Sequence, residues 1–187
     1  MVKAPLGLDQ HMPKPLQSFI LAVLFLLPFG RLVAQVIPED NTVAMIRANY
    51  LYQFANNNNW PAESKKGKFF VGILGNTDVY EIMSSRYGTK PIGSQTLDVL
   101  ALTDLPQNQP LHILYVDKSR KNDLPRILRE LKDKSTLVVT NWEGALGQGS
   151  DINFKNIDGS IRFELNKSSM ENRKITPGIK ILQWAIQ

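Results

Sequence analysis

Three continuous apolar runs alternate with helical patterns between residues 68 and 141. The runs KFFVGILGNTD (68–78), LHILYVD (111–117) and STLVVTN (135–141) are typical of strands buried on both faces. The spacing of apolar positions predicts helices over 78–87 and 122–133 between them, and PIGSQTLDVL (91–100) gives a weaker strand. Strands that alternate with helices favour parallel β-α units. We therefore expect an α/β domain with a mostly parallel, layered sheet.

The pattern changes to strict alternation near the C-terminus. Apolar and polar residues alternate through DINFKNIDGSIRFELN (151–166) about Asp158-Gly159, which is a strong signal for a β-hairpin. We expect an antiparallel hairpin at one edge of the sheet. Ser168 and Glu171 have the spacing of a capping box for a short helix. A last amphipathic helix is predicted through Ile179, Leu182 and Trp184.

A helix over residues 42–56 opens the domain, with apolar positions at Val43, Ile46, Tyr50, Leu51 and Phe54. Thr42 is its predicted N-cap, and Asp78 with Glu81 has capping-box spacing for the next helix. The run Asn56–Asn59 is expected to fray the last turn of the first helix, and Pro61 to hold Trp60 extended. An asparagine-rich ligand loop is the alternative interpretation.

Residues 16–34 have the layout of a secretory signal peptide. Their apolar core, FILAVLFLLPF, follows Lys3 and Lys14 and is about half the ~20 residues that a membrane span needs. We predict cleavage near Ala34 or Gln35, with residues 1–35 as leader and 36–187 as one domain. A retained anchor is the alternative. The chain has no cysteine, which excludes disulfides and a lipoprotein anchor.

The charge is mildly basic. The formal net charge is +5, and the leader contributes Lys3, Lys14 and Arg31 against Asp9. The densest basic cluster, Lys65, Lys66 and Lys68, lacks the interleaved aromatic residues of a nucleic-acid surface. We expect no nucleic-acid partner and interpret the cluster as a solvated loop.

The residue types exclude several chemistries. His112 is the single histidine of residues 36–187, and its place between Leu111 and Ile113 favours a structural, hydrogen-bonded histidine over a catalytic base. Without cysteine, a zinc site, a Cys-His pair or a Ser-His-Asp triad has too few members. The acids Asp117, Glu143 and Asp151 are isolated. We therefore expect no catalytic residue, metal site or cofactor, and we predict that the protein is not an enzyme.

The carboxyl ends of the predicted parallel strands are the best candidate for a ligand or partner surface, because that edge of an open α/β sheet forms the binding crevice. Ordinary solvated loops are the alternative interpretation. The candidate residues are Asn76, Thr77, Asp117, Lys118, Ser119, Asn141, Trp142 and Glu143.

Four ordered segments resemble the YfiR family of exported bacterial proteins. They are RANYLYQFANNNNWP, FFVGILGN, LHILYVDKS and GQGSDINFKNIDGSIRFELN. The first is similar to that family's opening, which ends in Trp-Pro, and the last to its ending of the form R-F-E-I-N. The resemblance extends over residues 42–187 and depends on the order of all four segments.

The resemblance implies a single Rossmann-like three-layer domain and a regulatory function. Members of the family restrain an inner-membrane diguanylate cyclase (YfiN-like) by contact with its periplasmic region, and so control cyclic di-GMP and biofilm formation. It also implies a periplasmic location and a homodimer. The alternative function is a periplasmic small-ligand-binding sensory module that acts on another membrane receptor, such as a histidine kinase.

Two departures from the family pattern limit what can be carried over. Leu111 stands where relatives commonly have a cysteine, which argues against switching by a disulfide. The segment before Trp60 is ANNNN, whereas relatives have mixed apolar and basic residues there. A partner surface at that segment would therefore differ in this protein.

Overall fold

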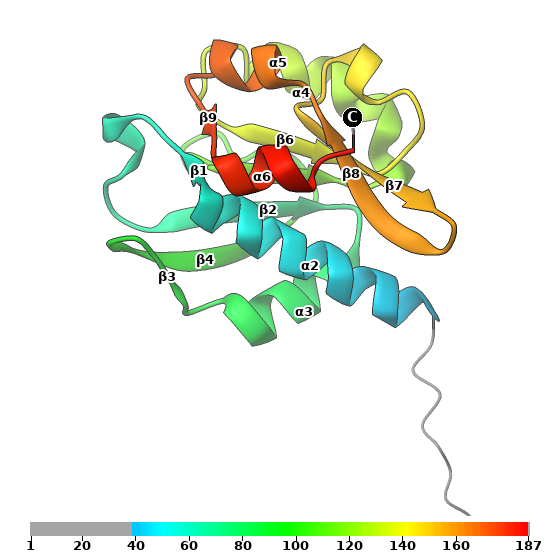
Figure 1. Cartoon of the computed structure of the whole chain (residues 1–187). Coiled ribbons are helices and arrows are strands. Elements are labelled where there is room, and N and C mark those ends of the chain that lie inside the picture. Colours follow the sequence, from blue (N-terminus) through cyan, green and yellow to red (C-terminus); the bar gives the residue numbers. More distant parts are fainter. Residues whose placement is uncertain (1–38, 187) are drawn as a thin grey trace, which may run out of the picture. The chain divides into compact units, whose positions relative to one another are not determined.

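The computed structural model describes residues 39–186 (Figure 1). The predicted signal peptide and its cleavage positions lie outside these residues. The first half contains α2 (Glu39–Asn57), β1 (Asn58–Asn59), η2 (Ala62–Ser64), β2 (Phe69–Leu74), α3 (Thr77–Tyr87), β3 (Pro91–Ile92) and β4 (Gln95–Leu102). The second half contains β5 (Ile113–Val116), η3 (Lys118–Asp123), α4 (Leu124–Glu130), β6 (Leu137–Thr140), η4 (Leu146–Gln148), β7 (Ile152–Ile157), β8 (Ser160–Leu165), α5 (Lys167–Asn172), β9 (Thr176–Pro177) and α6 (Ile179–Trp184).

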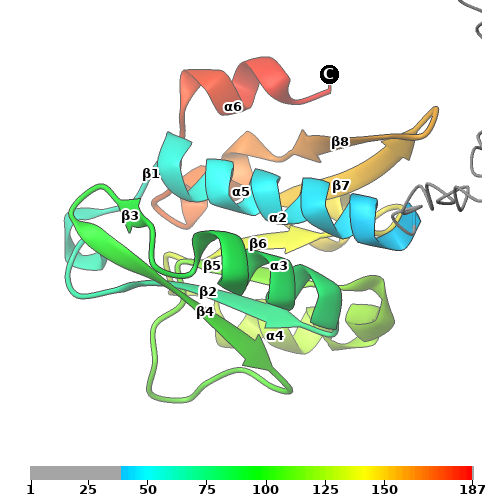
Figure 2. The same ribbon diagram turned by 90° about the horizontal axis from the view of Figure 1, so that it is seen from below.

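Seven strands form one mixed sheet in the order β3-β4-β2-β5-β6-β7-β8. The pairs from β4 through β7 are parallel, and the outer pairs β3–β4 and β7–β8 are antiparallel. Val71 of β2 lies between Val99 of β4 and Ile113 of β5, which fixes the central register. The mostly parallel α/β sheet with its edge hairpin is thus as predicted. The sheet is strongly curled (Figure 2), and the Rossmann-like three-layer arrangement stays a prediction.

Alternating residues of the central strands pack on opposite faces of the sheet. Ile113 and Tyr115 of β5 join a cluster with residues of α2 and α3, whereas Leu114 and Val116 join a second cluster with α4. This division follows from the two-residue period of a strand. It explains why the central strands are continuously apolar, since both faces are covered.

The β7–β8 hairpin forms as the sequence predicts. Asp158 and Gly159 connect the strands with φ values of 50° and 77°, which a tight hairpin turn requires of both central residues. Phe154 and Phe163 are directly paired, and the Phe163 ring meets Phe54 of α2 edge to face at 4.9 Å between centroids. The hairpin therefore buries its aromatic face against the first helix.

The asparagine run closes helix α2 instead of fraying it. The Nδ2 atoms of Asn56, Asn57 and Asn58 donate to the carbonyl oxygens four residues earlier, at 2.9, 2.9 and 3.1 Å. The Phe54 carbonyl is one of the last four of the helix, which have no N–H partner within the helix, whereas the Tyr52 and Gln53 carbonyls gain a second donor. Asn58 and Asn59 then pair with β9. The fraying prediction was wrong, because these side chains add hydrogen bonds along the last turn of α2, and the run lies in α2 and β1 rather than in a loop.

Three predicted helix starts were wrong. Helix α2 begins at Glu39, so Thr42 lies inside it rather than at its N-cap. Asn76 and Asn166 cap α3 and α5, because their side chains accept hydrogen bonds from Val79 N and Ser169 N. The predicted capping boxes at Asp78 and Ser168 each begin two residues beyond these caps. In each of these two cases an asparagine in extended conformation just before the helix takes the position.

The apolar face of α6 also differs from the prediction. Ile181 is the buried residue of this helix, whereas Ile179 is 75% exposed and Trp184 is 40% exposed. Gly178 explains the orientation, because a Cβ atom there would lie 1.9 Å from the Asn57 carbonyl oxygen. This close approach to the end of α2 fixes where α6 begins and which of its sides is buried.

Candidate functional site

The carboxyl ends of three neighbouring parallel strands meet in one polar cluster. Asn76 follows β2, Asp117 follows β5 and Asn141 follows β6. The Nδ2 atoms of Asn76 and Asn141 both donate to Asp117 Oδ2, at 3.2 and 2.9 Å. The structure therefore brings together side chains that lie up to 65 positions apart in the chain, as the strand-end argument predicted for parallel strands.

Asp117 is the centre of this cluster and is almost fully buried. Its Oδ2 atom also accepts from the Tyr115 hydroxyl at 3.3 Å, and its Oδ1 atom accepts from Ser119 N at 3.0 Å. Burial acts to raise the pKa of this carboxyl, but the donors from Ser119, Asn76 and Asn141 outweigh it, so the pKa lies below the ordinary value. Asp117 is held ionised by groups of the protein itself.

The rest of the predicted surface lies around this cluster. Asn141 Oδ1 accepts from Lys118 N at 2.6 Å, and Ser119 Oγ donates to Gly75 O at 3.1 Å. The side chains of Thr77, Lys118 and Glu143 are exposed. Trp142 turns away and packs against the α4 cluster. The inner residues thus bind one another, and the exposed residues form a rim around them.

At Gly75 the turn after β2 approaches the segment after β5 closely. The φ of Gly75 is +90°, and a Cβ atom there would lie 2.6 Å from Arg120 Cγ and 2.8 Å from Ser119 Oγ. Only glycine combines this backbone conformation with so little space. The turn after β2 therefore packs directly on the segment after β5.

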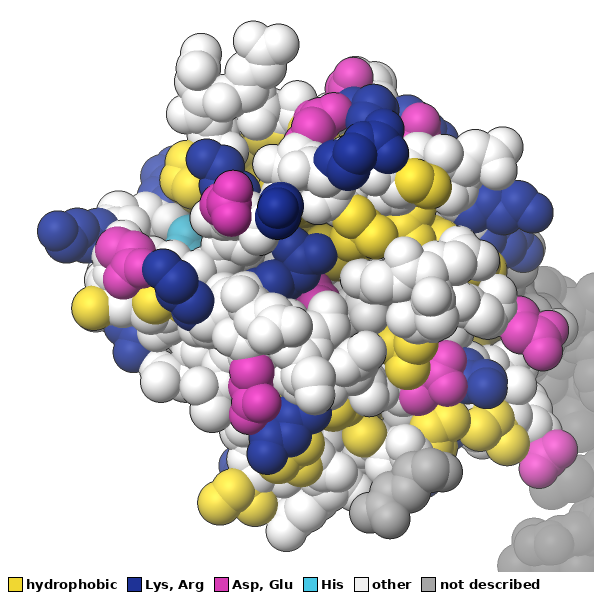
Figure 3. Space-filling model, turned by 90° about the horizontal axis from the view of Figure 1, so that it is seen from above, with side chains coloured by type: hydrophobic (Ala, Val, Ile, Leu, Met, Phe, Trp, Pro, Cys, Tyr) yellow, Lys and Arg dark blue, Asp and Glu magenta, His cyan; other side chains and the backbone are white. Residues whose placement is uncertain are grey.

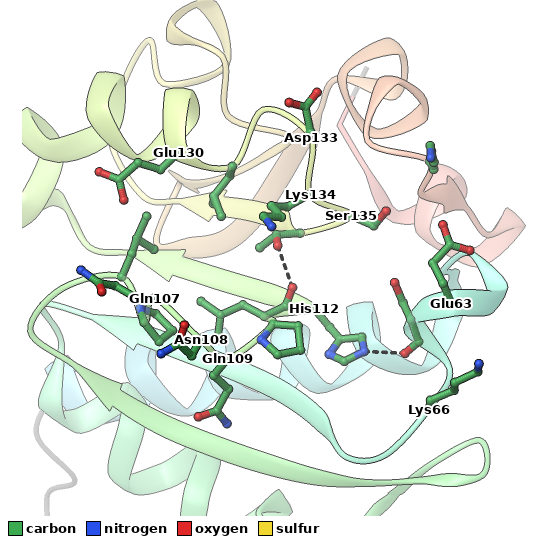
Figure 4. Close-up of a pocket in the computed structure, with 18 residues that line it drawn as sticks. Glu63, Lys66, Gln107, Asn108, Gln109, His112, Glu130, Asp133, Lys134 and Ser135 are labelled. Atoms are coloured by element: carbon green, nitrogen blue, oxygen red, sulfur yellow. Dashed lines mark hydrogen bonds between the residues drawn. The ribbon is translucent and has the colours of Figure 1, made fainter.

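A hollow of about 560 Å³ lies at the opposite edge of the sheet, near the amino ends of β5 and β6. Its walls come from three segments that are distant in sequence, 63–66, the loop 105–112 and residues 130–136 at the end of α4, together with Lys174 after α5 (Figure 4). Leu111 and Leu131 contribute apolar surface. Sequence reasoning missed this hollow, because no single segment carries a motif for it.

His112 forms part of the floor of the hollow and is bound on both ring nitrogens. Nδ1 accepts from Phe70 N at 3.0 Å, which leaves Nε2 to donate to Ser64 O at 2.7 Å. Burial lowers the pKa of His112 against the opposing effect of the Ser64 carbonyl. His112 is neutral and ties three backbone segments together, as predicted for a structural histidine.

The rim of the hollow carries charges of both signs. Lys66, Lys134 and Lys174 are exposed there, as are Glu63 and Asp133. The loop 107–109 adds the amide side chains Gln107, Asn108 and Gln109 to the lining (Figure 4). The hollow can therefore offer donors, acceptors and both charges to a small polar molecule.

The wider surface has a similar mixture. Basic and acidic side chains are interspersed on the face in Figure 3, with apolar side chains between them. Within residues 39–186, no three or more His, Asp or Glu side chains lie close enough together to hold a metal ion. No helix in that same part of the chain is long and apolar enough to cross a membrane.

The protein is an α/β domain in which polar side chains at the ends of the parallel strands hydrogen-bond to one another. The model of the YfiR/HmsC-like family matches residues 44–186. The chain belongs to this family, which confirms the resemblance read from its four ordered segments. A comparison with curated protein sequences finds no match.

Proposed function

We propose that the protein is a periplasmic regulator that represses an inner-membrane diguanylate cyclase by contact with the periplasmic region of that enzyme. Membership of the YfiR/HmsC-like family is the observation that carries this proposal. The repressor lowers cyclic di-GMP inside the cell and restrains biofilm growth. It acts as a homodimer, without a cofactor and without catalysis of its own.

The arrangement of the strand-end cluster supports a binding function over a catalytic one. Asp117 is held by four donors of the protein, so it has little capacity to exchange a proton with a substrate. Lys118 and Glu143 are exposed beside it. We propose this rim as the contact surface for the cyclase, where charged side chains would set the orientation of the partner.

Cellular cyclic di-GMP tests the proposal. Deletion of the gene in a strain that carries the cognate cyclase should raise cyclic di-GMP, and the wild-type gene should restore the low level. The double variant Lys118→Glu with Glu143→Lys should fail to restore it while folding normally, because both side chains are exposed. No rise on deletion would contradict the repressor function. Full restoration by the double variant would refute the rim as the contact surface, but not the repressor function.

A second candidate function is a small-ligand sensory module acting on a membrane receptor. The observation that favours it is the hollow of about 560 Å³, which is within the range of small-molecule sites. We propose the hollow, rather than the strand-end cluster, as the ligand site for this function. A thermal-shift screen of polar metabolites tests it, since a ligand that binds only the folded state raises the Tm. Lys134→Glu should abolish a genuine shift, and a flat response across the screen would count against the function.

A further inference from the structure

The outer edge of β4 is open over most of its length. β3 covers only Gln95 and Thr96. Figures 1 and 2 show β4 at the border of the sheet, with β2 on its inner side and the short β3 on its outer side. Leu97 N also donates to Lys90 O, at 3.0 Å on the β3 side. Successive peptide groups of a strand point to alternate edges. The peptide groups of Val99 and Ala101 therefore point outward, and among residues 39–186 they have no backbone partner.

The opposite border of the sheet is protected in ways that β4 is not. On β8, Ile186 N donates to Phe163 O at 2.9 Å, so the C-terminal segment covers part of that edge. Strand β8 also carries Arg162 and Glu164. Strand β4 has the sequence QTLDVLAL, with no Lys, Arg or Pro, which are the usual protections against pairing with another strand.

From these features we propose that β4 pairs antiparallel with β4 of a second copy about a twofold axis, which joins the two sheets into one. The inference rests on the self-association included in the proposed function, but not on the cyclase. An antiparallel pair is self-complementary under twofold symmetry, since each outward N–H meets the C=O of the same strand in the other copy. A second copy is therefore the occupant that this edge fits.

The register follows from hydrogen bonding and charge. With Leu100 opposite its own twin, Val99 lies opposite Ala101, and their free peptide groups form about four interchain hydrogen bonds. A register centred on Val99 would place Ala101 opposite Leu97, where Lys90 O is already bound. In the register centred on Leu100, Asp98 lies opposite Leu102 rather than its twin. A register centred on Asp98 would oppose two carboxylates, which is unfavourable. Each Asp98 also keeps its own partner, because Lys68 Nζ lies 2.8 Å from its Oδ2 atom.

The side chains of β4 suit this pairing on both faces. Leu97 and Val99 belong to the apolar cluster of α2 and α3, whereas Leu100 and Leu102 pack against the α4 cluster. Pairing two copies would continue both clusters across the junction. The five residues from Asp98 to Leu102 extend over roughly 17 Å. A surface of that length buries less than the ~800 Å² per partner of stable complexes, so we expect a weak, concentration-dependent dimer.

Sedimentation velocity of protein expressed from the full-length sequence tests the proposal over a range of micromolar concentrations. The wild type should change from monomer to dimer within that range. Ala101→Pro removes an outward N–H but no bond to β2, and should weaken the dimer at least about tenfold. Ala101→Val keeps the N–H and is the matched control, which should dimerise like the wild type. Circular dichroism shows whether each variant is folded.

Cross-linking provides an independent test, because the chain has no cysteine. In the proposed register the two Leu100 Cα atoms would lie about 4.5 Å apart, a distance that a disulfide can bridge. Leu100→Cys should therefore form covalent dimers under mild oxidation much faster than Ile179→Cys. Random collisions predict the opposite order, since Leu100 is half-buried and Ile179 is 75% exposed.

Two results would refute the β4 edge as the dimer interface. One is a folded Ala101→Pro variant that dimerises like the wild type, and the other is cross-linking of Ile179→Cys as fast as Leu100→Cys. If the wild type stays monomeric over the whole concentration range, both the β4 interface and the proposed homodimer are refuted. Repression of the cyclase is measured separately by cyclic di-GMP, so its failure and the failure of the dimer can be told apart.

Discussion

Replacement of Asp117 by alanine tests whether the strand-end cluster holds the fold together. The substitution removes the acceptor of four hydrogen bonds. The Tyr115 hydroxyl and the Asn141 amide are buried, so they would lose their acceptor without gaining water. Asn76 and Ser119 lie nearer the surface and can be rehydrated.

The magnitude follows from the two buried donors. A hydrogen bond to a charged group contributes about 1.5–3 kcal/mol, and a buried donor left without a partner costs a similar amount. Asp117→Ala should therefore lower the free energy of unfolding by about 3–6 kcal/mol. A domain is typically stable by only about 5–15 kcal/mol, so the variant should be close to unfolding at 37 °C.

Urea unfolding followed by circular dichroism measures this loss. The matched control is Asp123→Ala, which removes a partly exposed carboxylate 2.6 Å from Arg120 Nε. Such surface ion pairs contribute about 0–1 kcal/mol. If Asp117→Ala loses no more stability than Asp123→Ala, the interpretation of the cluster as a structural network is refuted.

Three further predictions concern residues outside the cluster. The stability of the protein should fall as pH decreases below 6.5, because His112 takes up a proton near its ordinary pKa of 6.5 in the unfolded chain but only at lower pH in the folded state. Urea unfolding of His112→Gln at several pH values should show a smaller dependence of stability on pH. Gly178→Ala should destabilise the protein by about 1–3 kcal/mol, since its Cβ would clash with Asn57 O, and an unchanged Tm would contradict this packing. Trp60 Nε1 is buried with no partner among residues 39–186, so Trp60→Phe should cost less than half of the about 3–5 kcal/mol expected for Trp60→Ala, and equal losses would show that the indole N–H has an acceptor.

The strands and the edge hairpin could be predicted because their signals are local. Continuous apolar runs indicate strands covered on both faces, and Asp158-Gly159 supplies the positive φ values that the hairpin turn needs. The helix caps were less predictable. The spacing of Asp78 and Glu81 fits a capping box, but the N-cap of α3 is Asn76, which follows β2 and accepts a hydrogen bond from Val79 N.

Features set by distant contacts could not be read from the sequence. The buried side of α6 depends on Gly178 meeting the end of α2, which a helical periodicity does not contain. The meeting of Asn76, Asp117 and Asn141 was predictable from parallel strand ends, but their mutual hydrogen bonding was not. The hollow beside His112 could not be predicted, because it forms only when three separate segments and Lys174 come together in the fold.

Direct binding to the cyclase tests the central proposal most directly. A tagged full-length protein should be exported and should co-purify from membranes with its cognate diguanylate cyclase, and the double variant Lys118→Glu with Glu143→Lys should recover much less of it. Recovery of no cyclase by the wild-type protein, from membranes in which the enzyme is present, would contradict repression by contact.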